Sequence, residues 1–267
     1  MVNSSSAKTL LPQVDGRALD FIKISAAVFM VIDHVNLIWL GGAEHGMFLV
    51  GRATFPLFCY ALAVAFLKAG PEKAPGYALR KYMPRLLALA VVSEVVSLIT
   101  RDTGLLNVIF TLALASGMAG LSYRLKDWQL VALCLLAVLL DEQYALWLGA
   151  RHLLPEFGMS GIMLPAAIMM YMQGRKGGML CILALVSIMN ISSLVEVFTH
   201  LSAQVMSYVG LIWFSSTVLP WWVVHWAQRM SNEGRLLPKY ALHIFYPGHL
   251  LALWGLLEIS RWIERAS

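Results

Sequence analysis

Apolar segments of helical length recur along this chain from residue 21 to residue 258, and no polar stretch between them is large enough for a separate soluble domain. The chain is 59% hydrophobic and only 13% charged, whereas an ordinary soluble domain has about 25% charged residues. This composition predicts an all-α, polytopic integral membrane helical bundle with about nine transmembrane helices, within a range of roughly eight to ten. The expected helical segments are residues 21–40, 47–67, 86–100, 105–123, 128–141, 159–173, 178–195, 205–226 and 240–258.

The sequence divides into a polar N-terminal segment at residues 1–18, a single membrane domain at 19–260 and a short polar tail at 261–267. The N-terminal segment lacks the basic region, short apolar stretch and cleavage site of a secretory signal. If this segment is cytoplasmic, all but five of the 20 lysines and arginines fall on the cytoplasmic side, the exceptions being Arg52, Arg101, Arg151, Arg261 and Arg265. The positive-inside rule therefore predicts a multi-pass protein with a cytoplasmic N-terminus.

Several classes of function are disfavoured. The net charge of +5 follows the expected topology, and no basic tract with interleaved aromatic residues is present, so we expect no nucleic-acid partner. The three cysteines, Cys59, Cys134 and Cys181, lie inside apolar runs and predict neither a disulfide framework nor a metal site. The phosphate-loop, dinucleotide-binding, zinc-protease and serine-hydrolase motifs are absent from the sequence.

The first apolar segment carries Lys23 and His34 on one side of a helix. Eleven residues separate them, which places them within about 20° of the same face and about 16 Å apart along the axis. An ionisable group in hydrocarbon costs several kcal/mol and is seldom kept without a use. His34 is therefore the leading functional candidate in the chain.

Other polar residues are expected at the same depth as His34: Asp33, Arg52, Glu94, Asn107, Thr111 and, near mid-membrane, His249. The alternative is that Asp33, Arg52 and Glu94 only neutralise one another as structural contacts. Asp33 and His34 are neighbours in the sequence, so their side chains diverge by about 100° around the helix and Asp33 cannot orient the imidazole. We expect Asp33 to pair with Arg52 or to receive a cationic substrate, and Glu94 to hold the imidazole. A buried histidine among acids is suited to act as a base near neutral pH.

A second polar set is expected at the inner membrane surface. Its members are Lys23, Arg80, Lys81, Arg85, Lys239, Tyr240 and His243. Positive-inside charge accounts for most of them without a ligand. However, residues 77–85 place three cations beside two tyrosines at a helix entrance, and this combination suits an adenine nucleotide with several phosphates.

Four blocks of the sequence resemble the TraX family. They are Leu19–Lys23 leading to Asp33–His34, Gly51–Phe58 (GRATFPLF), Asn107–Thr111 (NVIFT) and Lys239–Leu250 (KYALHIFYPGHL). The resemblance implies a bacterial inner-membrane protein of conjugative plasmids that is associated with N-terminal acetylation of the pilus subunit, pilin. The Lys23–His34 spacing also resembles the wider transmembrane acyltransferase superfamily, which implies an acyltransferase-like fold, a catalytic histidine and acetyl-CoA entering from the cytoplasm.

The resemblance implies an acetyl transfer in which His34 accepts a proton from the pilin amine, Arg52 or Asn107 stabilises the oxyanion, and Asp33 or Glu94 holds the incoming amine. Lys23, Arg80, Lys81 and Arg85 would bind the phosphates of acetyl-CoA, with Tyr240 and His243 beside them. His249 would line the thioester channel or bond a neighbouring carbonyl. No metal is expected.

Alternatives remain open at this stage: an acetyl-histidine relay in place of direct transfer, a glycan acceptor, pilin cyclisation, or a non-enzymatic transporter or assembly partner of the conjugation machinery.

Overall fold

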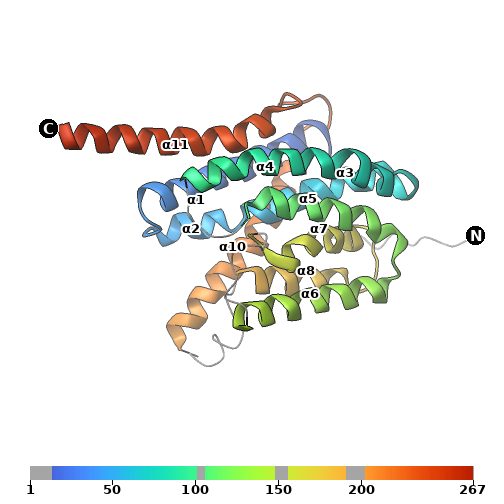
Figure 1. Cartoon of the computed structure of the whole chain (residues 1–267). Helices are drawn as coiled ribbons and strands as arrows, with labels where there is room; N and C mark the ends of the chain where they lie inside the picture. Colours follow the sequence, from blue (N-terminus) through green and yellow to red (C-terminus); the bar gives the residue numbers. More distant parts are fainter. Residues whose placement is uncertain (1–13, 101–105, 148–155, 191–201, 267) are drawn as a thin grey trace, which may run out of the picture.

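The computed structural model describes residues 14–100, 106–147, 156–190 and 202–266, and every regular element in these ranges is a helix. The all-α prediction is thereby confirmed. The helices are α1 (Gly16–Trp39), α2 (His45–Gly51), α3 (Thr54–Tyr77), η1 (Ala78–Tyr82), α4 (Met83–Thr100), α5 (Val108–Leu121), η2 (Ser122–Arg124), α6 (Asp127–Trp147), α7 (Gly158–Met172), α8 (Gly178–Asn190), α10 (Ala203–Ala227) and α11 (Ala241–Ala266) (Figure 1).

Four helical segments among the described residues are long and apolar enough to cross a membrane: Gly16–Trp39, His45–Thr100, Gln204–Ala227 and Ala241–Ala266. Three shorter apolar helices accompany them, at Val108–Arg124, Gly158–Met172 and Gly178–Asn190. The predicted count of about nine transmembrane helices is not confirmed by these lengths. Residues 191–195 of the expected segment 178–195, and most of the expected N-terminal segment, lie outside the described residues.

The core of the bundle is formed by α3 and α7. All residues of α7 from Ser160 to Met170 are buried, as expected for a helix that is apolar on every side. At Gly161 a Cβ would lie 2.9 Å from the side chain of Thr111 and 3.2 Å from that of Phe55, so the absent side chain lets α7 approach α5 and α3 closely.

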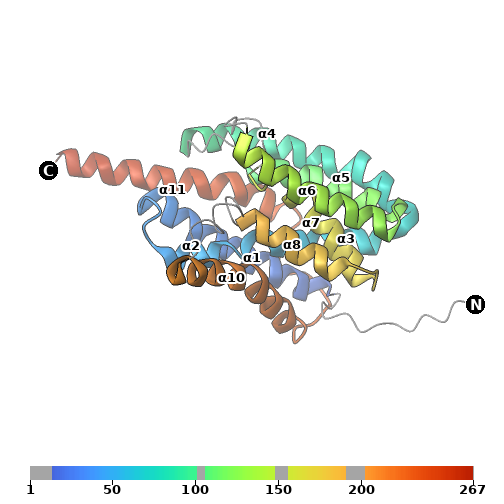
Figure 2. The ribbon, with the colours of Figure 1, turned by 90° about the horizontal axis from the view of Figure 1, so that it is seen from below.

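Around this core, α4 and α11 lie on one side of the bundle and α6 and α8 on the other (Figure 1). Seen from below, α6, α8 and α10 form the near face (Figure 2). The C-terminal part of α11 extends past the bundle in both views and includes residues 261–266, which the sequence places in a short polar tail.

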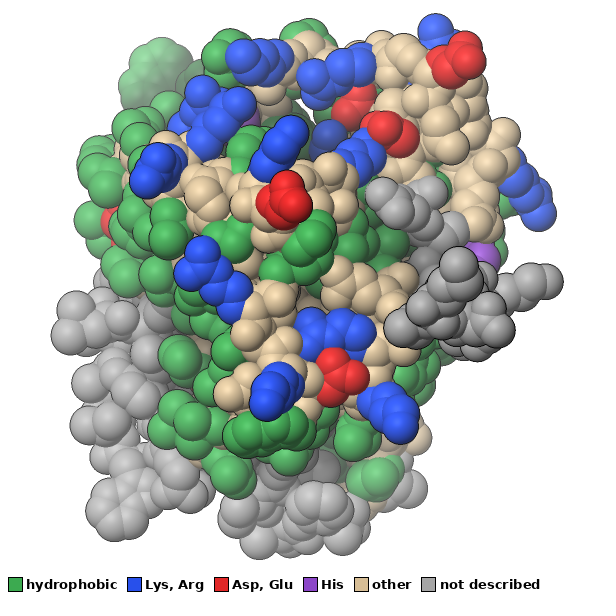
Figure 3. Space-filling view, turned by 90° about the vertical axis from the view of Figure 1, so that its right-hand side faces the viewer, with side chains coloured by type: hydrophobic (Ala, Val, Ile, Leu, Met, Phe, Trp, Pro, Cys, Tyr) green, Lys and Arg blue, Asp and Glu red, His purple; other side chains and the backbone are tan. Residues whose placement is uncertain are grey.

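One end of the bundle gathers the start of α1, the end of α3, the α5–α6 and α7–α8 connections and the α10–α11 connection (Figure 1). Lysine and arginine side chains collect on this face (Figure 3). The chain turns at Gly70, whose φ of 73° interrupts α3 and suits glycine because it has no Cβ. The π-helix η1 follows and carries Arg80 and Lys81 on its exposed surface.

Candidate active site

The rings of His34 and His249 meet inside the bundle. His34 lies on α1 and His249 on α11, and their side chains are buried, with 5% and 9% of the residue surface exposed. The distance from His34 Nδ1 to His249 Nε2 is 2.7 Å, and the two rings lie nearly in one plane and meet edge to edge, with centroids 5.0 Å apart at an interplanar angle of 14°. Two histidines that are 215 residues apart in sequence thus form one hydrogen-bonded pair.

The ring of His249 is itself fixed by α11. His249 Nδ1 lies 2.9 Å from the carbonyl oxygen of Phe245, one turn earlier. The Phe245 ring stacks on the His249 ring with centroids 4.9 Å apart, and Tyr246 contacts it edge-on at 5.7 Å. These contacts leave the imidazole of His249 little freedom to rotate, so it offers a rigid partner to His34.

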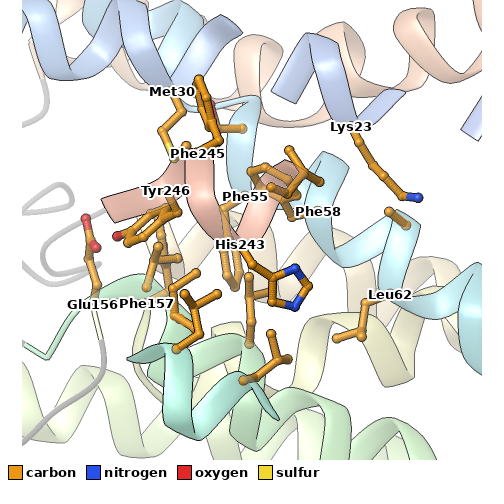
Figure 4. Close-up of a pocket in the computed structure, with 18 of the residues that line it drawn as sticks. Lys23, Met30, Phe55, Phe58, Leu62, Glu156, Phe157, His243, Phe245 and Tyr246 are labelled. Carbon is orange, nitrogen blue, oxygen red and sulfur yellow. The ribbon is translucent and has the colours of Figure 1, made fainter. Parts of the chain in front are cut away.

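His34 also lines a cavity of about 210 Å³, which we call the central cavity. Asp33, Arg52 and Glu156 line the same cavity, as do Lys23 and His243. Lys23 and Glu156 lie at opposite ends of it, with Phe55, Phe58 and His243 between them (Figure 4). The central cavity therefore joins polar groups at two ends through an apolar, largely aromatic middle.

A second cavity of about 280 Å³ adjoins the central cavity at its Lys23 end. Its cations are Lys23, Arg85, Arg235 and Lys239, and we call it the basic mouth. Lys23, Tyr82, Leu86, Leu242 and His243 line both cavities. The shared walls place the cluster of cations next to the cavity that His34 lines.

Asp33 and Arg52 form the ion pair that the sequence predicts. Arg52 Nη2 lies 3.4 Å from Asp33 Oδ2, and both side chains are about four-fifths buried. The guanidinium also lies 4.3 Å from the centre of the Phe48 ring, a cation–π contact. Arg52 Nε is buried and makes no hydrogen bond within the described residues, so one donor of the pair is left for a ligand.

Glu94 is held by Asn107. Glu94 Oε2 accepts from the Asn107 backbone NH at 2.9 Å and from Asn107 Nδ2 at 2.6 Å. Asn107 Nδ2 also donates to the carbonyl of Ala90, while its Oδ1 caps the start of α5 by accepting from the NH of Ile109. The partner of the His34 ring expected at Glu94 is thus provided by His249, and the Glu94 carboxylate is used to join α4 to α5.

The basic mouth is held together by Asp20, a residue that the expected membrane depths of the polar residues did not single out. Its side chain is 2% exposed and accepts from the backbone NH groups of Leu236 and Leu237 at 3.0 and 3.1 Å. Lys23 Nζ lies 3.1 Å from Asp20 Oδ1, and Arg235 Nε lies 3.7 Å from Oδ2. Asp20 therefore fastens the segment before α11 to α1 and keeps the cations of the mouth together.

The remaining predicted site residues are divided between the mouth and the protein surface. His243 lines both cavities, and its Nδ1 is buried without a hydrogen-bond partner in the described part of the chain. Arg85 lines the basic mouth, whereas Arg80 and Lys81 are exposed on η1 and line neither cavity. Tyr240 is 55% exposed and lies beside His243 with ring centroids 6.0 Å apart.

Sequence reasoning missed Glu156, Phe157, Asp20 and Arg235 as cavity residues. Asp20 has a sequence signal, because a carboxylate three residues before Lys23 lies on the same helix face. Glu156 belongs to the irregular stretch before α7 and carries no periodic signal. Among the described residues no group of three or more His, Cys, Asp or Glu side chains is arranged to hold a metal ion.

These features define a helical membrane protein in which a buried histidine, hydrogen-bonded to a second histidine, lines a cavity that adjoins a cluster of cations. The family model described as TraX protein matches residues 18–257, which is nearly the whole chain. The chain therefore belongs to the TraX family. No curated protein and no solved structure matches it.

Proposed function

We propose that this protein is a membrane-embedded acetyltransferase that moves an acetyl group from cytoplasmic acetyl-CoA to the N-terminal amine of a conjugative pilus subunit. The observation that carries the proposal is that the basic mouth adjoins the central cavity, which His34 lines. Membership of the TraX family supports a pilin-modifying role in conjugation. In this proposal the membrane is the bacterial inner membrane and the basic mouth faces the cytoplasm, as the positive-inside rule favours.

The basic mouth suits the phosphate groups of coenzyme A. Arg85, Arg235 and Lys239 supply donors and positive charge at its rim, and Lys23 lies where the mouth meets the central cavity. Lys23 and His34 lie about 16 Å apart along α1, a span that the extended pantetheine arm can cross. The thioester then reaches the histidine while the charged nucleotide stays at the mouth.

The acceptor amine reacts beside His34 in the central cavity. The neutral nitrogen attacks the acetyl carbonyl and a C–N bond forms while His34 takes the proton from nitrogen. The C–S bond then breaks, and the departing thiolate of coenzyme A takes that proton back from His34. Each turnover yields an N-acetylated pilin and free coenzyme A, with the protein unchanged.

Arg52 is the donor best placed to stabilise the oxyanion. Its Nε is buried without a partner, and a preformed donor in a dry site stabilises developing negative charge strongly. Asn107 is less suited, because both its amide donor and its backbone NH are directed to α4. Asp33 and Glu156 line the cavity and provide the carboxylates that attract the cationic form of the amine.

The test is the intact mass of a pilin subunit co-expressed with the wild-type protein or with His34→Gln. We expect an acetyl-sized increment with the wild type and its loss with the variant. His225→Gln is the matched control, because His225 lies on α10, outside the residues that line the central cavity, and bonds the carbonyl of Trp221 in its own helix. Equal pilin masses in all three samples would remove the proposal.

A glycan acceptor is distinguished in the same experiment. It predicts an unmodified pilin and an O-acetylated envelope polymer that depends on His34. A transporter or assembly partner predicts that neither pilin nor polymer gains an acetyl group.

A further inference from the structure

The hydrogen bonds of His249 determine where the protons lie on both rings of the histidine pair. The carbonyl oxygen of Phe245 can only accept, so the contact at 2.9 Å requires a proton on His249 Nδ1. A neutral His249 then carries a lone pair on Nε2. Because His34 Nδ1 lies 2.7 Å from that nitrogen, His34 must donate from Nδ1, and a neutral His34 carries its lone pair on Nε2.

Of the two rings, only one is accessible from the central cavity. His34 lines the central cavity, whereas His249 is not among the residues that line it. The chain of donors runs from His34 to His249 and ends at a backbone carbonyl of α11. The His34 ring therefore faces the central cavity, and the His249 ring contacts it on the side away from the cavity.

We propose that His249 is the positioning residue that holds His34 in the tautomer with an unprotonated Nε2. The catalytic part of this inference rests on the proposed acetyl transfer, for which Nε2 is the atom that receives the proton of the amine. When Nε2 is protonated, the hydrogen bond from His34 Nδ1 to His249 becomes charge-assisted. This stronger bond stabilises the imidazolium form of His34. His249 thus performs with a neutral nitrogen the orienting role that a carboxylate performs in a catalytic triad.

A packing role alone would not need an imidazole at this position. The Phe245 ring stacks on His249, whereas His34 meets His249 edge to edge through the 2.7 Å contact, so a longer phenylalanine ring at residue 249 would clash with His34. A leucine at residue 249 fills much of the same space and loses only the hydrogen bonds. A glutamine at residue 249 would keep a carbonyl acceptor near the position of Nε2. The two substitutions therefore separate the acceptor function from the packing function.

The kinetic test compares His249→Leu and His249→Gln with the wild type, with His225→Leu as the control on α10. We expect His249→Leu to lower kcat at least about 100-fold, by analogy with the loss of the correct tautomer in a triad. The KM for acetyl-CoA should stay within about threefold, because the basic mouth is untouched. We expect His249→Gln to recover kcat to within about tenfold of the wild type. Equal losses in both variants, or wild-type kcat in His249→Leu, would overturn the inference.

A second measurement is independent of activity. In ¹⁵N-histidine-labelled wild-type protein, the His34 signals, assigned by their loss in His34→Gln, should show a protonated Nδ1 and an unprotonated Nε2. In His249→Leu they should change to a mixture of tautomers. A protein that fails to acetylate pilin yet shows this tautomer would remove the proposed function and support the role of His249. A wild-type His34 that is protonated at Nε2 would overturn that role even in an active enzyme.

Discussion

The backbone of Gly51 lies directly against the carboxyl group of Asp33. A Cβ at Gly51 would be 2.5 Å from Asp33 Cγ and 2.5 Å from Asp33 Oδ1, a separation that no side chain can occupy without displacing the carboxylate. This approach brings the end of α2 onto α1 and places Arg52, the next residue, 3.4 Å from Asp33. The ion pair beside His34 therefore depends on a glycine.

Gly51→Ala should impair the proposed acetyl transfer without unfolding the bundle. The new methyl group must push Asp33 aside, and Arg52 then loses its position at the central cavity. We expect kcat to fall at least about tenfold, the loss typical of a displaced charge-assisted contact. Gly46→Ala is the matched control on the same helix, since a Cβ there meets nothing within 4 Å. Equal kcat values for the two variants would contradict the prediction.

Asn107→Ala should lower stability more than it lowers the affinity for acetyl-CoA. The substitution removes an N-cap, worth about 1 kcal/mol, and bonds to the Glu94 carboxylate and the Ala90 carbonyl, worth about 1–3 kcal/mol more. Thermal unfolding should therefore start at least about 4 °C lower. Asn190→Ala is the control, because among the described residues Asn190 Nδ2 donates within its own helix, to the carbonyl of Val186. An unchanged Tm with a large loss of kcat would instead make Asn107 a catalytic donor.

The helical class of the fold and the position of Lys23 and His34 on one side of a helix were predictable from the sequence. They depend only on composition and on the helical repeat within one segment. The structure places both residues on one cavity. The partner of His34 was not predictable. Depth brings Glu94 and His249 to similar levels, but only the rotation of α4 and α11 decides which of them faces His34, and that rotation comes from packing between helices far apart in sequence.

The separation of Arg80 from the basic mouth, which Arg85 lines, has a related cause. Arg80 and Arg85 are five residues apart, which places them about 140° apart on an α-helix, and the π-helix η1 shifts the register further. They consequently face different surroundings. The number of membrane spans is equally hard to derive, because apolar helices such as Gly178–Asn190 are shorter than the roughly 20 residues that cross a bilayer.

Asp20→Asn should weaken acetyl-CoA binding in particular. The neutral amide loses the charge that holds Lys23 and Arg235. Its one oxygen can still accept from the backbone NH groups of Leu236 and Leu237, which both donate to Oδ2 of Asp20. We expect KM for acetyl-CoA to rise about tenfold while kcat stays within about threefold. Glu233→Gln, an exposed acid in the same connection, should leave both unchanged. A fall in kcat at constant KM would contradict the assignment of Asp20 to the mouth.

Removal of two different pairs of cations should change the KM for acetyl-CoA to different extents. Arg85 and Lys239 line the basic mouth, whereas Arg80 and Lys81 line neither cavity. Because an exposed charge-assisted contact to phosphate contributes about 1 kcal/mol or more, Arg85→Ala with Lys239→Ala should raise KM for acetyl-CoA about tenfold or more. Arg80→Ala with Lys81→Ala should change it less than about twofold.

Both double variants lose two positive charges, so a general effect of surface charge would change KM equally in both. Initial rates at varied acetyl-CoA, measured with the protein in vesicles of fixed composition, separate these outcomes. An equal rise in both would mean that the adjoining cavities do not define the nucleotide site.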